Sequence, residues 1–134
     1  MNYWLIKSEP NTYSWDDLVK DKQTYWDGVR NYQARNNMKA MQKGDLALYY
    51  HSVNEKSIVG IAKIVKEHYQ DPTTDDERWV VVDVAPERPL KKPVTLADVK
   101  ADERLAQMVL VKNSRLSVQP VKKEEFDIII GLSE

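Results

Sequence analysis

A chain of 134 residues is long enough to bury one sizeable core and short enough to form a single domain. Its 20 Lys and Arg residues against 21 Asp and Glu residues leave a formal charge of −1. It therefore does not have the basic surplus typical of proteins that coat nucleic-acid backbone. The lack of cysteine excludes disulfides and thiolate catalysis, and no apolar stretch approaches the roughly 20 residues that span a bilayer. We expect a monomeric cytoplasmic domain over residues 1–134, with no leader segment and no membrane contact.

The first third of the chain predicts one buried strand and two helices. Residues 3–7 carry large apolar side chains on both faces, which is typical of a strand covered on both sides. Ser14 and Asp17 have the spacing of a capping box, which predicts a short helix over residues 14–19. A second helix is expected from an N-cap at Asn31 to about Gln42.

The middle of the chain predicts three strands, over residues 46–50, 58–65 and 79–84. Gly60 interrupts the second of them and indicates a bulge or a tight bend, as barrels need at their corners. A polar turn over residues 53–56 separates the first two strands. The proline-bearing segment 86–93 is expected to close the third strand.

The last third predicts short elements. Thr95 followed by an acid three residues later indicates a short helix over residues 95–99, and residues 102–107 are expected to form one helical turn. Residues 108–111 predict a short strand, and the polar segment 113–120 is expected to be irregular. Acidic residues at the start of segment 124–130, with a glycine after it, predict a terminal helix.

The order of these elements favours an α+β fold. Five strands and several short helices follow one another without regular alternation, which favours a small, largely antiparallel barrel over a βαβ sheet. No glycine-rich phosphate loop is present, so we expect no nucleotide cofactor, and no other cofactor is expected either.

One stretch, residues 26–38, concentrates recognition chemistry. It holds two aromatic residues, two arginines, three asparagines, a glutamine and a glycine, with a single carboxylate. Flat rings, amide groups and guanidinium groups are what proteins use to hold an unstacked nucleobase. The alternative interpretation is an ordinary helix start. Both can hold, because the helix from Asn31 would be structural and the loop before it would be the candidate site.

Catalysis is not expected from the polar residues available. A hydrolase needs a nucleophile, a base and a group that orients the base. Ser8, Ser52 or Ser117 could be combined with His51, but no local spacing links them. His51 and His68 do not have the spacing of a metal site. We therefore expect no enzymatic activity, no catalytic residue and no bound metal.

Five segments of the chain together resemble the EVE domain. They are YWLIKSEP at residues 3–10, WDGVRNYQARN at 26–36, YHS at 50–52, KIVKE at 63–67 and RLSVQP at 115–120. The resemblance covers nearly the whole chain. It implies a single EVE domain over residues 1–134 with the PUA-like fold, a mixed, mostly antiparallel pseudo-β-barrel with short helices at its corners. The loop between Tyr69 and Trp79 is shorter here than in the longer eukaryotic members, so its contacts are not carried over.

The resemblance implies a protein that reads modified bases, with modified cytosine in DNA, 5-methylcytosine or a derivative, as the favoured ligand. DNA is favoured over RNA as the partner. An RNA-modification binding module, an enzyme acting on a modified nucleoside and a protein-interaction module remain alternatives. The residues expected to bind the base or the nucleic acid are Lys7, Ser8, Trp26, Gly28, Val29, Arg30, Asn31, Tyr32, Arg35, Asn36, His51, Ser52, Arg115, Ser117 and Gln119.

Roles can be suggested for some of these residues. Trp26 or Tyr32 is the candidate for stacking on an extruded base. The candidates for reading the base edge are Asn31, Asn36 and backbone groups near Gly28. Arg30 and Arg35 are candidates for phosphate contacts, and the alternative is that either is tied to Glu9 or Asp27 inside the fold.

Overall fold

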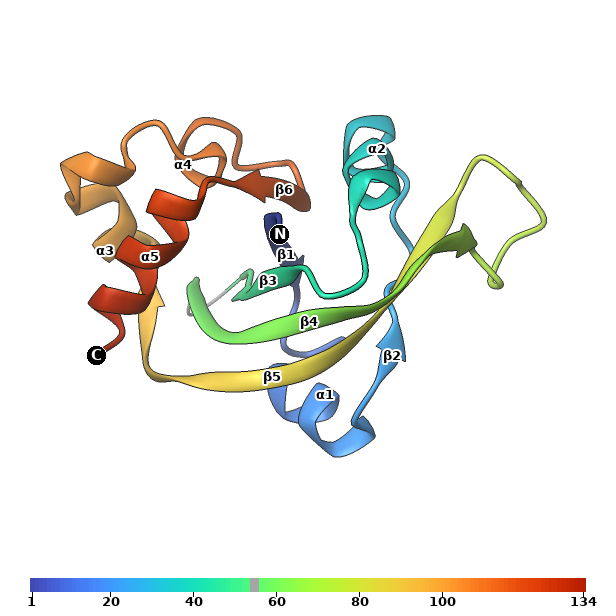
Figure 1. Cartoon of the computed structure of the whole chain (residues 1–134), viewed down its shortest axis with the longest axis horizontal. Helices are drawn as coiled ribbons and strands as arrows, with labels where there is room; N and C mark the ends of the chain where they lie inside the picture. Colours follow the sequence, from blue (N-terminus) through green and yellow to red (C-terminus); the bar gives the residue numbers. More distant parts are fainter. Residues whose placement is uncertain (54–55) are drawn as a thin grey trace.

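Six strands form one curved sheet in the order β2-β5-β4-β3-β1-β6 (Figure 1). The computed structural model describes residues 1–53 and 56–134. The strands are β1 (Tyr3–Ser8), β2 (Thr24–Tyr25), β3 (Leu46–His51), β4 (Ser57–Gln70), β5 (Val80–Thr95) and β6 (Val118–Val121). The pairing of β1 with β3 is parallel, and the other four pairings are antiparallel. The expectation of a mixed, mostly antiparallel α+β fold is thereby confirmed.

Short helices lie around this sheet. They are α1 (Trp15–Asp21), α2 (Tyr32–Ala40), α3 (Leu96–Ala101), the 3-10 helix η1 (Glu103–Leu105), α4 (Val109–Lys112) and α5 (Lys123–Leu132). Figure 1 shows α3, α4 and α5 gathered at one end, with α2 at the other side of β6. Among the described residues, no helix has the length and apolar character needed to cross a membrane.

The helix starts follow from local sequence. Ser14 opens α1 through a capping box in which its side chain and that of Asp17 exchange hydrogen bonds with each other's backbone. Thr95 opens α3 in the same way. The Asn31 side chain accepts a hydrogen bond from the Ala34 N–H and begins α2. The predicted starts of these three helices are confirmed.

Three predictions about the later elements are wrong. Residues 108–111 belong mainly to α4 rather than to a strand, because a four-residue apolar run has no period that separates a buried helical turn from a strand. The segment 86–93 does not end β5, which continues to Thr95. Among the described residues, β5 pairs with no strand other than β4 beyond Val84. Its other edge is unpaired there, so a proline without an N–H can be tolerated.

The third error concerns β6. The segment 113–120 is predicted to be irregular, yet its last three residues belong to β6, which pairs with β1 at the end of the sheet. A strand at the end of a sheet pairs along one edge only, and it tolerates a proline such as Pro120 at its open edge. The predicted turn over 53–56 cannot be compared in full, since residues 54 and 55 lie outside the described residues.

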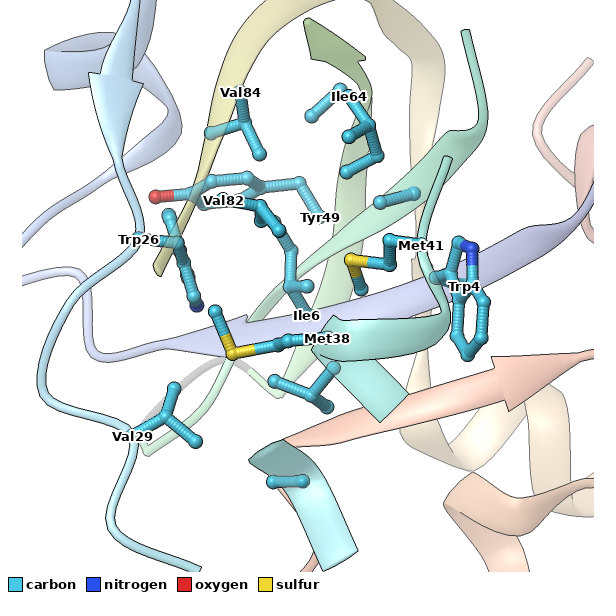
Figure 2. Packing of buried hydrophobic residues seen from close by; sticks show 14 of the residues in the cluster. Trp4, Ile6, Trp26, Val29, Met38, Met41, Tyr49, Ile64, Val82 and Val84 are labelled. Atoms are coloured by element: carbon cyan, nitrogen blue, oxygen red, sulfur yellow. The ribbon is translucent and has the colours of Figure 1, made fainter. Parts of the chain in front are cut away.

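The sheet separates two apolar cores. Trp4 and Ile6 of β1 point into the first core, together with Tyr49 of β3, whereas Leu5 and Leu48 point into the second. The expectation that residues 3–7 are buried on both faces is confirmed. Figure 2 shows the first core, in which Trp26 and Tyr49 lie close to Met38 of α2 and Val82 of β5. The candidate site lies at the edge of this first core.

Gly60 explains how α1 packs closely against β4. A Cβ atom at this position would lie 2.7 Å from ring atoms of Trp15, which is the first residue of α1. The pairing of β4 with β5 also shifts register between Ile58 and Gly60. The predicted irregularity at Gly60 is confirmed, and the indole ring that lies on the strand explains why this position has no side chain.

Candidate nucleic-acid interface

A pocket of about 580 Å³ opens where the end of β1 meets the loop that leads into α2. It is lined by residues 7–9, Thr12, Tyr13, residues 24–30 and Ser117. The lining therefore combines strand ends from the sheet with the loop that the sequence singles out. Three aromatic side chains, those of Tyr13, Tyr25 and Trp26, contribute to its walls.

Trp26 belongs to the core as much as to the pocket. Its side chain is 9% exposed and meets the Tyr49 ring edge-on at 5.5 Å. Its backbone N–H donates to the Val82 carbonyl at 2.8 Å, which continues the short pairing of β2 with β5. Only a small part of the indole therefore borders the pocket. Tyr25, the preceding residue, also belongs to the lining and is 43% exposed.

The loop from Gly28 to Arg30 is shaped by its backbone. Gly28 has a φ of +77°, a conformation that other residues adopt at a cost, and no atom lies within 4 Å of where its Cβ would be. Val29 is buried in the first core and anchors the loop there. Arg30 remains partly exposed at the pocket, and its guanidinium contacts Asp71 at 3.1 Å.

Asp71 is a residue that the sequence did not identify. Its side chain is fully buried and accepts hydrogen bonds from the Gly28 N–H at 3.3 Å, from Arg30 and from Thr73. Burial acts to raise the pKa of Asp71, but hydrogen bonds from Thr73, Arg30 and Gly28 outweigh it, so the pKa is lowered. Arg30 is thus tied to Asp71 and not to Glu9 or Asp27. The local sequence, Asp-Pro-Thr, is typical of a turn, but it does not indicate which distant residues the Asp71 side chain contacts.

The predicted residues of α2 lie outside the pocket lining. Asn31 uses its side-chain oxygen to cap the helix. Tyr32 is 50% exposed and stacks on the Trp79 ring at 5.2 Å. Arg35 lies over Tyr32 at 4.9 Å and donates to the Asn36 side chain at 2.8 Å. These side chains form a surface next to the pocket and do not face into it.

The ends of β1 and β3 meet because the two strands are parallel. Ser8 and His51 are directly paired, and the Ser52 N–H donates to the Ser8 carbonyl at 2.9 Å. Ser8 lines the pocket, whereas His51 and Ser52 do not. The Nε2 atom of His51 accepts the Trp15 N–H at 3.0 Å, so this ring nitrogen holds the start of α1.

Of the three site residues predicted between positions 115 and 119, one lines the pocket. Ser117 lines the pocket, and its carbonyl accepts the Lys7 N–H at 3.0 Å. Gln119 is fully buried and donates to the Leu116 carbonyl at 2.8 Å, so it fixes the preceding turn instead. Arg115 is exposed and does not belong to the lining.

The charges at the pocket are balanced. Lys7 and Arg30 face Glu9 and Asp27 among the lining residues. The Lys7 ammonium donates to the Ser114 carbonyl at 2.7 Å, and its partial burial lowers its pKa. Such a pocket suits a neutral polar ring better than a phosphate group. Within the described ranges, no group of three or more potential metal ligands is found.

Comparisons with known proteins identify the family. The EVE domain model matches residues 2–132. Thymocyte nuclear protein 1 from Mus musculus is 41% identical over an alignment that covers 99% of this chain and 74% of that protein. A Rhodopseudomonas palustris protein solved by NMR is 51% identical with a TM-score of 0.95, covering 99% of this chain and 93% of that chain.

A further solved structure of a relative contains DNA. It is human THYN1 protein in complex with 5-methylcytosine-containing DNA, with 38% identity and a TM-score of 0.92. The match covers 100% of this chain and 98% of the human one. The matching model and these relatives agree along almost the full length of the sequence. This chain therefore belongs to the EVE domain family.

Proposed function

We propose that this protein binds nucleic acid through one extruded modified base, and that its preferred ligand is 5-methylcytosine, or a derivative of it, in DNA. The observation that carries the proposal is the human relative, whose structure contains 5-methylcytosine DNA and whose fold matches this chain from end to end. The pocket next to Trp26 is the site to which we assign the base.

The size and lining of the pocket support this assignment. Its volume of about 580 Å³ lies within the range of about 300–1,000 Å³ typical of small-ligand sites. Ser8, Thr24 and Ser117 add hydroxyl groups to the lining. Those of Ser8 and Thr24 donate to the Tyr13 and Tyr25 carbonyls at 2.6 and 3.4 Å, so in this arrangement they would offer the polar edge of a base an acceptor oxygen. Tyr13, Tyr25 and Trp26 supply apolar ring surface around the same space.

The pocket must offset the cost of extruding the base. Extruding a base costs a few kcal/mol of stacking and pairing, and contact with one aromatic ring returns about 1–3 kcal/mol. Hydrogen bonds to the base edge and a contact for the methyl group add to this. Tyr25 is the most exposed ring of the lining, so we assign it the main stacking contact and assign Trp26 the floor beneath it.

Binding of matched duplexes tests the proposal. One duplex carries a single 5-methylcytosine and the other carries cytosine at that position. We expect wild type to prefer the methylated duplex by about tenfold, as one well-packed methyl group provides. Tyr25→Ala should lose about tenfold in affinity for it, whereas Tyr25→Phe keeps the ring and should bind like wild type. Equal affinity of wild type for both duplexes would contradict the proposal, and preference for a modified RNA would favour the RNA alternative.

We further propose that binding occurs without turnover. The imidazole of His51 is the nearest candidate base, but its Nε2 accepts the Trp15 N–H and it is absent from the pocket lining. Oligonucleotides with modified bases, incubated with the protein and divalent metals, should be recovered unchanged by mass spectrometry. Reproducible conversion that disappears in a His51→Ala variant would show that the protein is an enzyme.

A further inference from the structure

The loop between β4 and β5, residues 71–79, contacts the loop of residues 26–30, called here the pocket loop, on the side away from the pocket. Asp71, at the start of this loop, is fully buried and does not line the pocket. One of its carboxylate oxygens, Oδ2, accepts the Gly28 N–H at 3.3 Å and the Arg30 guanidinium at 3.1 Å. Both donors belong to the pocket lining. A residue outside the pocket thus holds two positions of its wall, which lie two residues apart in the same loop.

The second oxygen of Asp71 is held by its own loop. Oδ1 accepts the Thr73 N–H at 2.7 Å and also the Thr73 hydroxyl. The Asp71 N–H in turn donates to the Trp79 carbonyl at 2.9 Å, which closes the loop at its base. The carboxylate therefore links the two loops, because Oδ1 is bound within the β4–β5 loop and Oδ2 is bound to the pocket loop. Its position is set by the β4–β5 loop, and it transmits that position to the pocket loop.

A ring stack joins the same two regions. Trp79, at the end of the β4–β5 loop, stacks on Tyr32 with an interplanar angle of 27°. The Arg30 guanidinium lies 5.5 Å from the Trp79 ring, and Arg35 donates to the Arg78 carbonyl at 3.4 Å. The β4–β5 loop projects from the sheet on the side of α2 (Figure 1). The end of the pocket loop and the first turn of α2 are therefore fixed to it together.

The charges around the stacked rings of Tyr32 and Trp79 argue against a phosphate-binding role for that surface. Residues 71–77 carry four carboxylates, which oppose the approach of a phosphate backbone. Arg30 is paired with Asp71, and Arg78 is paired with Asp76 through both guanidinium and backbone donors. The arginines around these rings thus have partners inside the fold, and their contacts hold the loop in place.

We propose that Asp71 is a positioning residue of the base pocket, acting through the Gly28 N–H and the Arg30 guanidinium. The inference rests on the proposed function of the pocket. Gly28 holds a left-handed backbone conformation that a free loop would leave often, so a fixed acceptor is needed to keep the pocket formed before binding. Loss of that acceptor weakens recognition of the base and leaves contacts with the nucleic-acid backbone elsewhere unchanged.

The test compares Asp71→Asn with Asp75→Asn, a matched control that removes an exposed carboxylate from the same loop. We expect Asp71→Asn to lose about tenfold in affinity for the methylated duplex and less for the unmethylated one. Asp75→Asn should keep the wild-type preference. In the free protein, NMR-detected hydrogen exchange at the Gly28 amide should become faster in Asp71→Asn and stay unchanged in Asp75→Asn.

A second variant covers the risk that the buried substitution prevents folding. Thr73→Val changes an exposed residue and removes only the hydroxyl that holds Oδ1. It should shift both readouts in the same direction by a smaller amount. An Asp71→Asn protein that keeps its discrimination and its Gly28 protection would overturn the role of Asp71; if it does not fold, an unchanged Thr73→Val would do so. Wild type that does not distinguish the duplexes would instead overturn the proposed function.

Discussion

Two neighbouring residues of the pocket lining, Tyr25 and Trp26, differ in burial, and the proposed function assigns them different roles. Both line it, but Trp26 is 9% exposed and packed against Tyr49, whereas Tyr25 is 43% exposed. Trp26→Ala should therefore lower the free energy of unfolding by about 3–5 kcal/mol. Tyr25→Ala should change it by only about 0.5 kcal/mol. Urea denaturation followed by circular dichroism measures both, and a Tyr25→Ala loss as large as that of Trp26→Ala would contradict this division.

The same contrast shows what the sequence could reveal about the site. The segment from Trp26 to Arg30 was recognisable because its composition is unusual over a short range, and it does line the pocket. Asp71 was not recognisable, because its partners Gly28 and Arg30 are more than 40 residues away. The residues next to Asp71 in the sequence do not predict such a pairing. A residue whose role depends on a distant partner becomes visible only in the folded chain.

At the level of elements, local chemistry was a reliable guide wherever a helix begins with a cap. The Ser14 and Thr95 capping boxes and the Asn31 cap each predicted a helix that the structure contains. Short elements without such a signal were misassigned. α4 has no side-chain cap, and β6 is a strand because β1 supplies its partner, not because of its own residues.

The contact between α1 and β4 yields a prediction at this scale. In Gly60→Ala, the new methyl group would lie 2.7 Å from the Trp15 ring, which is itself buried. Either the indole or the helix must move, so the free energy of unfolding should fall by about 1–3 kcal/mol, as overpacking typically costs. Thermal unfolding of Gly60→Ala beside Gly131→Ala, whose Cβ would meet no atom within 4 Å, gives the measurement and its control. Equal melting temperatures for the two variants would contradict the prediction.

For the molecule as a whole, the balance of charge determines how binding should respond to salt. The formal charge is −1, and the pocket sets two cations against two carboxylates. Under the proposed function, nucleic-acid binding would therefore depend on one pocket and a few phosphate contacts, and not on a continuous basic surface. Exposed Arg115, close to the pocket wall at Ser117, is the natural candidate for one of those contacts.

The salt dependence of binding is therefore expected to be shallow. With about two phosphate contacts, the slope of log K against log salt should be about −1.8, so affinity for the methylated duplex should fall only about tenfold between 50 and 200 mM salt. Proteins that make 6–10 phosphate contacts lose about 10³–10⁵ over the same range. Arg115→Ala should weaken methylated and unmethylated duplexes equally and reduce the slope by about one. Fluorescence anisotropy over a salt series measures this, with Lys100→Ala, exposed on α3 at the far end of the sheet, as the control. A slope steeper than about −5 would mean that a long stretch of backbone is bound, and that base extrusion does not dominate the affinity.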